Sequence, residues 1–114
     1  MSRITQILSA SFILALAACG GGTNSSAPPG NTVAATAGLT FSPNPLTINS
    51  GETVSFAFGS VAHNVTFDAP NAATPADIPG NNSNVSVERT FATAGTYRFH
   101  CTIHPGMAGS IVVR

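Results

Sequence analysis

The chain has 114 residues, of which only 7% are charged; lysine is absent, and four arginines balance four acidic residues. This length fits a single domain, and the balanced charge gives no basic field for nucleic acid and no acidic tail for a cationic partner. With 11 glycines, 8 prolines and plentiful Val, Thr, Ser and Asn, the composition favours short strands and many turns over helices.

Residues 1–18 are predicted to be a signal peptide. Arg3 provides a positive start, and the apolar stretch 7–18 is too short for a membrane span, which needs about 20 residues. The run Leu16-Ala17-Ala18-Cys19 resembles the bacterial lipoprotein box, in which the cysteine is lipidated and becomes the first mature residue. The alternative is an ordinary secretory signal followed by an incidental cysteine.

Residues 19–36 are predicted to be a lipidated N-terminus and a flexible linker. They are rich in Gly, Ser, Asn and Pro, and the linker would reach roughly 20–25 Å. The lipoprotein resemblance implies an exported domain, anchored through Cys19 to a membrane of the bacterial cell envelope on its periplasmic side. The outer membrane is favoured because Gly20 stands where Asp often signals inner-membrane retention.

Residues 37–114 are predicted to form one all-β domain. Apolar and polar residues alternate in short runs separated by turns, at Phe41, 46–48, 54–58, 63–67, 85–91, 96–101 and 108–113. The pattern favours a two-sheet antiparallel Greek-key β-sandwich of about seven to eight strands. The connection 68–84 contains three prolines and many asparagines and is assigned no regular structure. Arg89 on the inward side indicates a bulge, a strand edge or an error in the assumed alternation.

Metal-ligand side chains are few enough to count completely. Apart from Cys19, residues 19–114 contain three histidines, one cysteine and one methionine. Four of these five form one pattern, in which His63 is followed at a distance by Cys-x-x-His-x-x-Met at Cys101, His104 and Met107. Two imidazoles, a thiolate and a weak axial thioether are the ligand set of a mononuclear blue-copper centre.

Strand alternation provides an independent test of this ligand set. Period-two alternation places His63, Cys101 and Met107 on the inward side of their strands. His63 shares its side with Val65 and Phe67. Cys101 shares its side with Phe99 and Tyr97, and Met107 shares its side with Ile111 and Val113. His100 has the opposite parity and is predicted to face solvent.

The segment 95–107, GTYRFHCTIHPGM, resembles the ligand loop of the cupredoxins, and its short Cys-x-x-His-x-x-Met spacing is most similar to that of amicyanin. The segments 50–54 and 62–65 are also similar, so the resemblance covers roughly residues 46–113. It implies one copper ion cycling between Cu(II) and Cu(I). His63 and His104 would bind it through ring nitrogens, Cys101 through its thiolate and Met107 weakly along the axis.

The resemblance also implies roles for neighbouring residues. Asn64 would tie the His63 strand to the cysteine loop near Thr102, and redox proteins would dock at an apolar patch around the His104 edge. Ile103 stands where similar loops often have proline. We hypothesise that its N–H donates to the Cys101 sulfur and raises the reduction potential.

The function implied is a monomeric, membrane-tethered carrier of single electrons. A copper storage or delivery protein of the same fold is the alternative, and a metal-free adhesion-type sandwich or a Zn²⁺ site built from Cys and His is a third reading. An enzyme is not expected, because copper oxidases and nitrite reductases need further histidine clusters and only His100 remains. Some proteins of the resembled family dock through an acidic patch, which this sequence lacks. The resemblance therefore does not identify the redox partner.

Overall fold

The computed structural model describes residues 27–28 and 30–114. The predicted signal peptide and Cys19 lie outside the described residues. Within the described ranges, no helix is long and apolar enough to cross a membrane.

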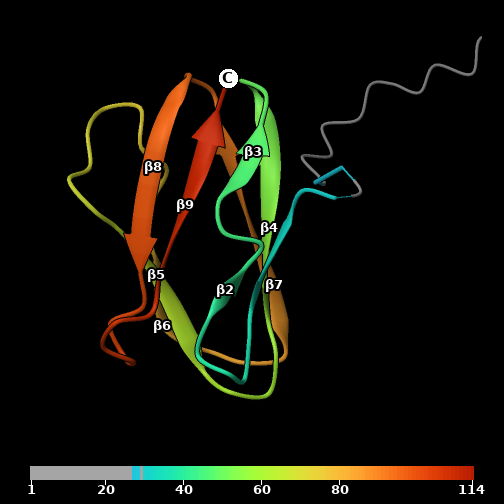
Figure 1. Ribbon diagram of the computed structural model, residues 1–114, viewed down its shortest axis with the longest axis vertical. Helices are drawn as coiled ribbons and strands as arrows, with labels where there is room; N and C mark the ends of the chain where they lie inside the picture. Colours follow the sequence, from blue (N-terminus) through green and yellow to red (C-terminus); the bar gives the residue numbers. More distant parts are fainter. Residues whose placement is uncertain (1–26, 29) are drawn as a thin grey trace, which may run out of the picture.

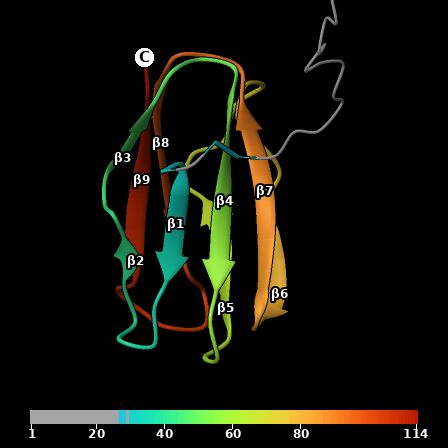
Figure 2. The same cartoon turned by 90° about the vertical axis from the view of Figure 1, so that its right-hand side faces the viewer.

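The described chain forms a two-sheet β-sandwich, as predicted (Figures 1 and 2). One sheet has the strand order β2-β1-β4-β7 and the other has the order β3-β9-β8-β5-β6. The nine strands of the described residues are β1 (Thr32–Ala35), β2 (Phe41–Ser42), β3 (Leu46–Ile48), β4 (Glu52–Phe58), β5 (His63–Phe67), β6 (Ile78–Asn82), β7 (Val85–Phe91), β8 (Gly95–His100) and β9 (Ala108–Val113).

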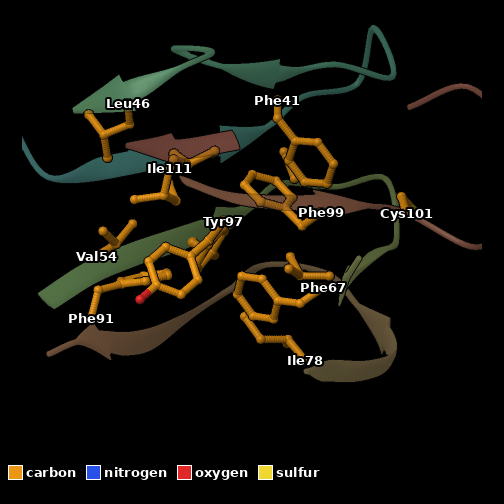
Figure 3. Packing of buried hydrophobic residues seen from close by; sticks show 14 of the residues in the cluster. Phe41, Leu46, Val54, Phe67, Ile78, Phe91, Tyr97, Phe99, Cys101 and Ile111 are labelled. Atoms are coloured by element: carbon orange, nitrogen blue, oxygen red, sulfur yellow. The ribbon is translucent and has the colours of Figure 1, made fainter. Parts of the chain in front are cut away.

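The core between the sheets follows from period-two alternation. In β8, for example, Tyr97 and Phe99 are buried while Arg98 is exposed. Phe99 is central: its ring packs edge-on against Phe41, Phe56 and Phe67, with centroids 4.8, 5.4 and 6.0 Å away. Edge-to-face pairs of this kind add to the stabilisation from buried apolar area. Figure 3 shows Phe41, Phe67 and Phe99 of this cluster, with Cys101 beyond Phe99 at one end of the core.

The folded domain begins earlier in the chain than predicted. Residues 32–35 were assigned to the flexible linker but form β1, which pairs with β2 and with β4. Val33 and Ala35 are buried, so this segment belongs to the core. The sheets are also not entirely antiparallel, because β1 pairs with β4 and β3 pairs with β9 in parallel.

The connection 68–84 also contains structure that the prediction missed. Ile78–Asn82 forms β6, an edge strand beside β5, and Ile78 is 2% exposed. Arg89 lies on β7, the edge strand of the other sheet, and its guanidinium donates to the carbonyl oxygens of Ala76 and Asp77. The edge interpretation of Arg89 is therefore the correct one: the side chain closes the open side of the sandwich.

Candidate metal centre

Three connections that hold or adjoin the predicted ligands lie at the same end of the sandwich (Figures 1 and 2). They are the β1–β2 turn, the β4–β5 turn and the β8–β9 loop. His63 begins β5, Cys101 directly follows β8, and Met107 directly precedes β9. His63, Cys101 and Met107 are 0, 2 and 3% exposed, while His104 is only partly buried. The inward orientation predicted from alternation is therefore observed for the three strand-end ligands.

The ligand atoms of His63, Cys101 and His104 converge. The two Nδ1 atoms of the histidines are 3.1 Å apart. Cys101 Sγ lies 3.9 Å from Nδ1 of His63 and 3.7 Å from Nδ1 of His104. A first-row metal ion binds imidazole nitrogen at about 2.0–2.1 Å and thiolate sulfur at about 2.3 Å. All three separations are shorter than the corresponding sums of two bond lengths, so one ion can bind all three atoms.

The ring of His63 is oriented by a main-chain carbonyl. Its Nε2 lies 2.8 Å from Thr36 O, in the β1–β2 turn. A carbonyl oxygen can only accept, so Nε2 carries the proton and Nδ1 keeps the lone pair that a metal needs. Sequence reasoning missed this contact because main-chain carbonyls leave no signature in a sequence.

The β8–β9 loop is closed by its own main chain. The Cys101 N–H donates to Met107 O, and the Met107 N–H donates to His104 O, at 2.9 and 3.1 Å. Between His104 and Met107 stand Pro105 and Gly106, and Gly106 has φ +86°. Proline followed by a glycine with positive φ is typical of a type II turn. This turn returns the chain so that His104 and Met107 both lie near Cys101.

The expected tie between the His63 strand and the cysteine loop is formed by Asn64. Its Nδ2 donates to Thr102 Oγ1 at 2.6 Å, and the Thr102 N–H donates to Asn64 Oδ1 at 2.8 Å. Ile103 is 38% exposed. In the described part of the chain no hydrogen bond from its N–H to the Cys101 sulfur is seen, so the Ile103 hypothesis stays a prediction.

His100 does not join the ligand cluster. Its side chain is 42% exposed and contacts the Asp68 carboxylate through Nδ1. The only group of His, Cys and acidic side chains in the described residues that can hold a metal comprises His63, Cys101 and His104. Alternation thus separated the ligands from the remaining histidine.

A comparison with protein families identifies the family of this chain. Residues 29–114 match the family described as copper binding proteins, plastocyanin/azurin family. The chain belongs to this family. Together with the converging donors, the membership assigns a type 1 copper site to His63, Cys101, His104 and Met107.

Relatives of this cupredoxin include plant plastocyanins. The chain is 34% identical over 89 residues to a chloroplastic plastocyanin of Oryza sativa subsp. indica, covering 66% of this chain and 55% of the rice protein. It is 32% identical over 88 residues to plastocyanin A/B of Petroselinum crispum, covering 67% and 89%.

Solved structures agree with the sequence comparison. The oxidized form of an amicyanin point mutant superposes with a TM-score of 0.63 at 28% identity, over 78% of this chain and 86% of amicyanin. The copper-containing nitrite reductase of Thermus scotoductus gives a TM-score of 0.66 at 27% identity, but over only 24% of that larger chain. The similarity to the reductase is therefore limited to one cupredoxin-sized part of it.

Proposed function

We propose that this cupredoxin is an electron carrier that is tethered to the bacterial cell envelope and exchanges one electron at a time with redox proteins. When bound, copper supplies the Cu(II)/Cu(I) couple. The observation that carries the proposal is the fixed donor set: His63 and Cys101 are buried, and His63 is oriented by the Thr36 carbonyl. Donors that are held in place need little rearrangement when the charge on the metal changes.

The same rigidity favours electron transfer over copper delivery. A delivery protein must release its ion to an acceptor, yet His63 is fully buried and only His104 among the histidine ligands is partly accessible. Cyclic voltammetry of the copper-loaded protein tests the proposal, and a reversible, fast one-electron wave is expected. Rapid transfer of Cu(I) to a competing acceptor, without a stable Cu(II) form, would favour the delivery protein.

The colour of the protein tests the donor set directly. The copper-loaded protein should be intensely blue because of charge transfer from the thiolate to Cu(II). The Cys101→Ser variant should lose this band, whereas His100→Ala should keep it because His100 lies outside the ligand cluster. A blue band that survives Cys101→Ser would contradict the proposed site.

The partner is proposed to dock where His104 approaches the surface. Three large apolar side chains are exposed in the described residues, and all belong to this end of the sandwich. Leu39 is in the β1–β2 turn, Ile103 is in the ligand loop, and Val85 is paired with Phe58 at the end of β4. An apolar surface beside a partly buried ligand lets a redox partner approach closely while excluding water.

Electron self-exchange between two copies of the protein tests this docking face without a known partner. Leu39 has φ +61°, a conformation that asparagine tolerates, so Leu39→Asn removes apolar area with little backbone strain. We expect slower self-exchange at an unchanged potential. Ala94→Asn, an exposed change in the β7–β8 turn at the opposite end, is the matched control. Equal rates for both variants would place the docking face elsewhere.

The membrane tether is proposed from the lipobox resemblance. Cys19→Ala should prevent lipidation and move the protein from the membrane fraction to the soluble periplasmic fraction. Persistent membrane association of the Cys19→Ala protein would remove the anchor from the proposal and leave electron transfer untouched. For the wild-type protein, separation of the inner from the outer membrane tests the expected outer-membrane location.

A further inference from the structure

The β5–β6 pair contains an irregularity directly beside the copper ligand His63. His63 is opposite Asn82, and Val65 is opposite Ile78, so two steps along β5 correspond to four steps along β6. The extra residues on β6 include Gly80, whose φ of +88° is readily adopted only by glycine. Bulges near functional sites commonly redirect a side chain or end a strand pairing.

The side chain of Asn82 closes this bulge onto His63. Its amide nitrogen donates to Pro79 O at 3.1 Å and to His63 O at 3.0 Å. The first hydrogen bond spans the bulge, and the second holds the main chain of the ligand itself. Because one amide group makes both, the position of the His63 backbone depends on the conformation of the bulge.

A second anchor acts at the other end of β5. Asp77 Oδ1 accepts the Phe67 N–H at 2.9 Å, just before β6 begins. The segment 77–82 therefore forms hydrogen bonds to both ends of β5. Asp77 binds the end far from the metal, and Asn82 binds the metal ligand. This arrangement separates a purely structural anchor from one that touches the site.

We propose that Asn82 is a positioning residue of the copper site, acting through the main chain of His63. Thr36 orients the His63 ring, Asn64 links the next residue to Thr102, and Asn82 fixes the His63 carbonyl. Each contact comes from a different part of the chain. Together they fix the ring, the following residue and the backbone of the most buried ligand.

The test compares Asn82→Leu with two controls. Leucine has nearly the shape of asparagine but donates no hydrogen bond. Asn81→Leu makes the same chemical change at an exposed position of the same bulge, and Asp77→Ala removes the distant anchor. For each protein we would measure Cu(I) affinity by chelator competition, the Cu(II) hyperfine splitting by electron paramagnetic resonance, and unfolding of the copper-free form.

We expect Asn82→Leu to weaken copper binding about 10–100-fold, the usual effect of removing a residue that supports a metal ligand. The hyperfine splitting should change as well. Asp77→Ala should lower only the stability of the copper-free form, and Asn81→Leu should behave like the wild type. If Asn82→Leu fails to fold, Asn82→Ser, which keeps one shorter donor, should show a smaller change of the same kind. Wild-type affinity and hyperfine splitting in whichever Asn82 variant folds would overturn the proposal.

Discussion

Asn64 and Thr102 exchange two hydrogen bonds across 38 positions of sequence, one from each partner to the other. Asn64 is 7% exposed, so its amide would be costly to bury without these partners. The pair joins the strand that begins with His63 to the loop that begins with Cys101. Two ligands that are distant in sequence are thereby held in a common frame.

We predict that Asn64→Leu lowers the free energy of unfolding of the copper-free protein by about 1–3 kcal/mol, because it leaves the Thr102 N–H without its acceptor. Denaturant unfolding measures this loss. In a double-mutant cycle with Thr102→Val, the two changes should be strongly non-additive because each removes the same side-chain pair. Additive effects would show that the pair is not coupled.

Gly109 is predicted to be the least replaceable glycine of the described core. A Cβ atom at this position would lie 2.8 Å from Phe99 Cζ and 3.2 Å from Phe41 Cβ. Gly109→Ala should therefore lower the unfolding free energy by about 1–3 kcal/mol through overpacking of the aromatic cluster. Gly59→Ala, where a Cβ meets nothing within 4 Å, should change stability by less than about 0.5 kcal/mol. Similar unfolding midpoints for the two variants would contradict this packing.

The rate of electron self-exchange is predicted to be nearly independent of ionic strength. Residues 36–40, 59–62, 83–84 and 101–107, the connections at the copper end, contain no Asp, Glu, Lys or Arg. Salt shortens the distance over which charges interact, from about 30 Å at 0.01 M to about 8 Å at 0.15 M. A face without charged side chains has few such interactions to weaken. Nuclear magnetic resonance line broadening measures the rate.

The control for this prediction is Ile103→Glu, which places one carboxylate on the docking face of each copy. Its self-exchange should be slower at low salt and should recover as salt is added, since two like charges then approach each other. A strong salt dependence in the wild-type protein would mean that more distant charges control docking.

The reduction potential is predicted to depend on the N–H of Ile103. If this group donates to the Cys101 sulfur in the copper-loaded protein, it withdraws charge from the thiolate and favours Cu(I). Ile103→Pro removes the donor, so voltammetry should show a lower potential. Ile103→Val keeps the N–H and is the matched control. An unchanged potential in the proline variant would exclude the hydrogen bond.

The sequence alone was sufficient for the local parts of the site. Cys101, His104 and Met107 are close in the chain, and the Pro-Gly turn at 105–106 returns the chain toward Cys101. Period-two alternation also predicted which strand-end side chains point inward, because successive side chains of a strand always face opposite ways. The same reasoning separated His100 from the ligands.

Tertiary structure decided what supports His63. The Thr36 carbonyl and the Asn82 amide reach it from β1's end and from β6, two elements that the sequence pattern did not reveal. β1 has only four residues and continues a Gly-, Ser- and Pro-rich segment, so it is too short to stand out. β6 contains proline, glycine and asparagine and so lacks a strand-like composition. Such strands are stabilised by hydrogen bonds to neighbouring strands. Those neighbours come alongside them only when the two sheets pack around a common core.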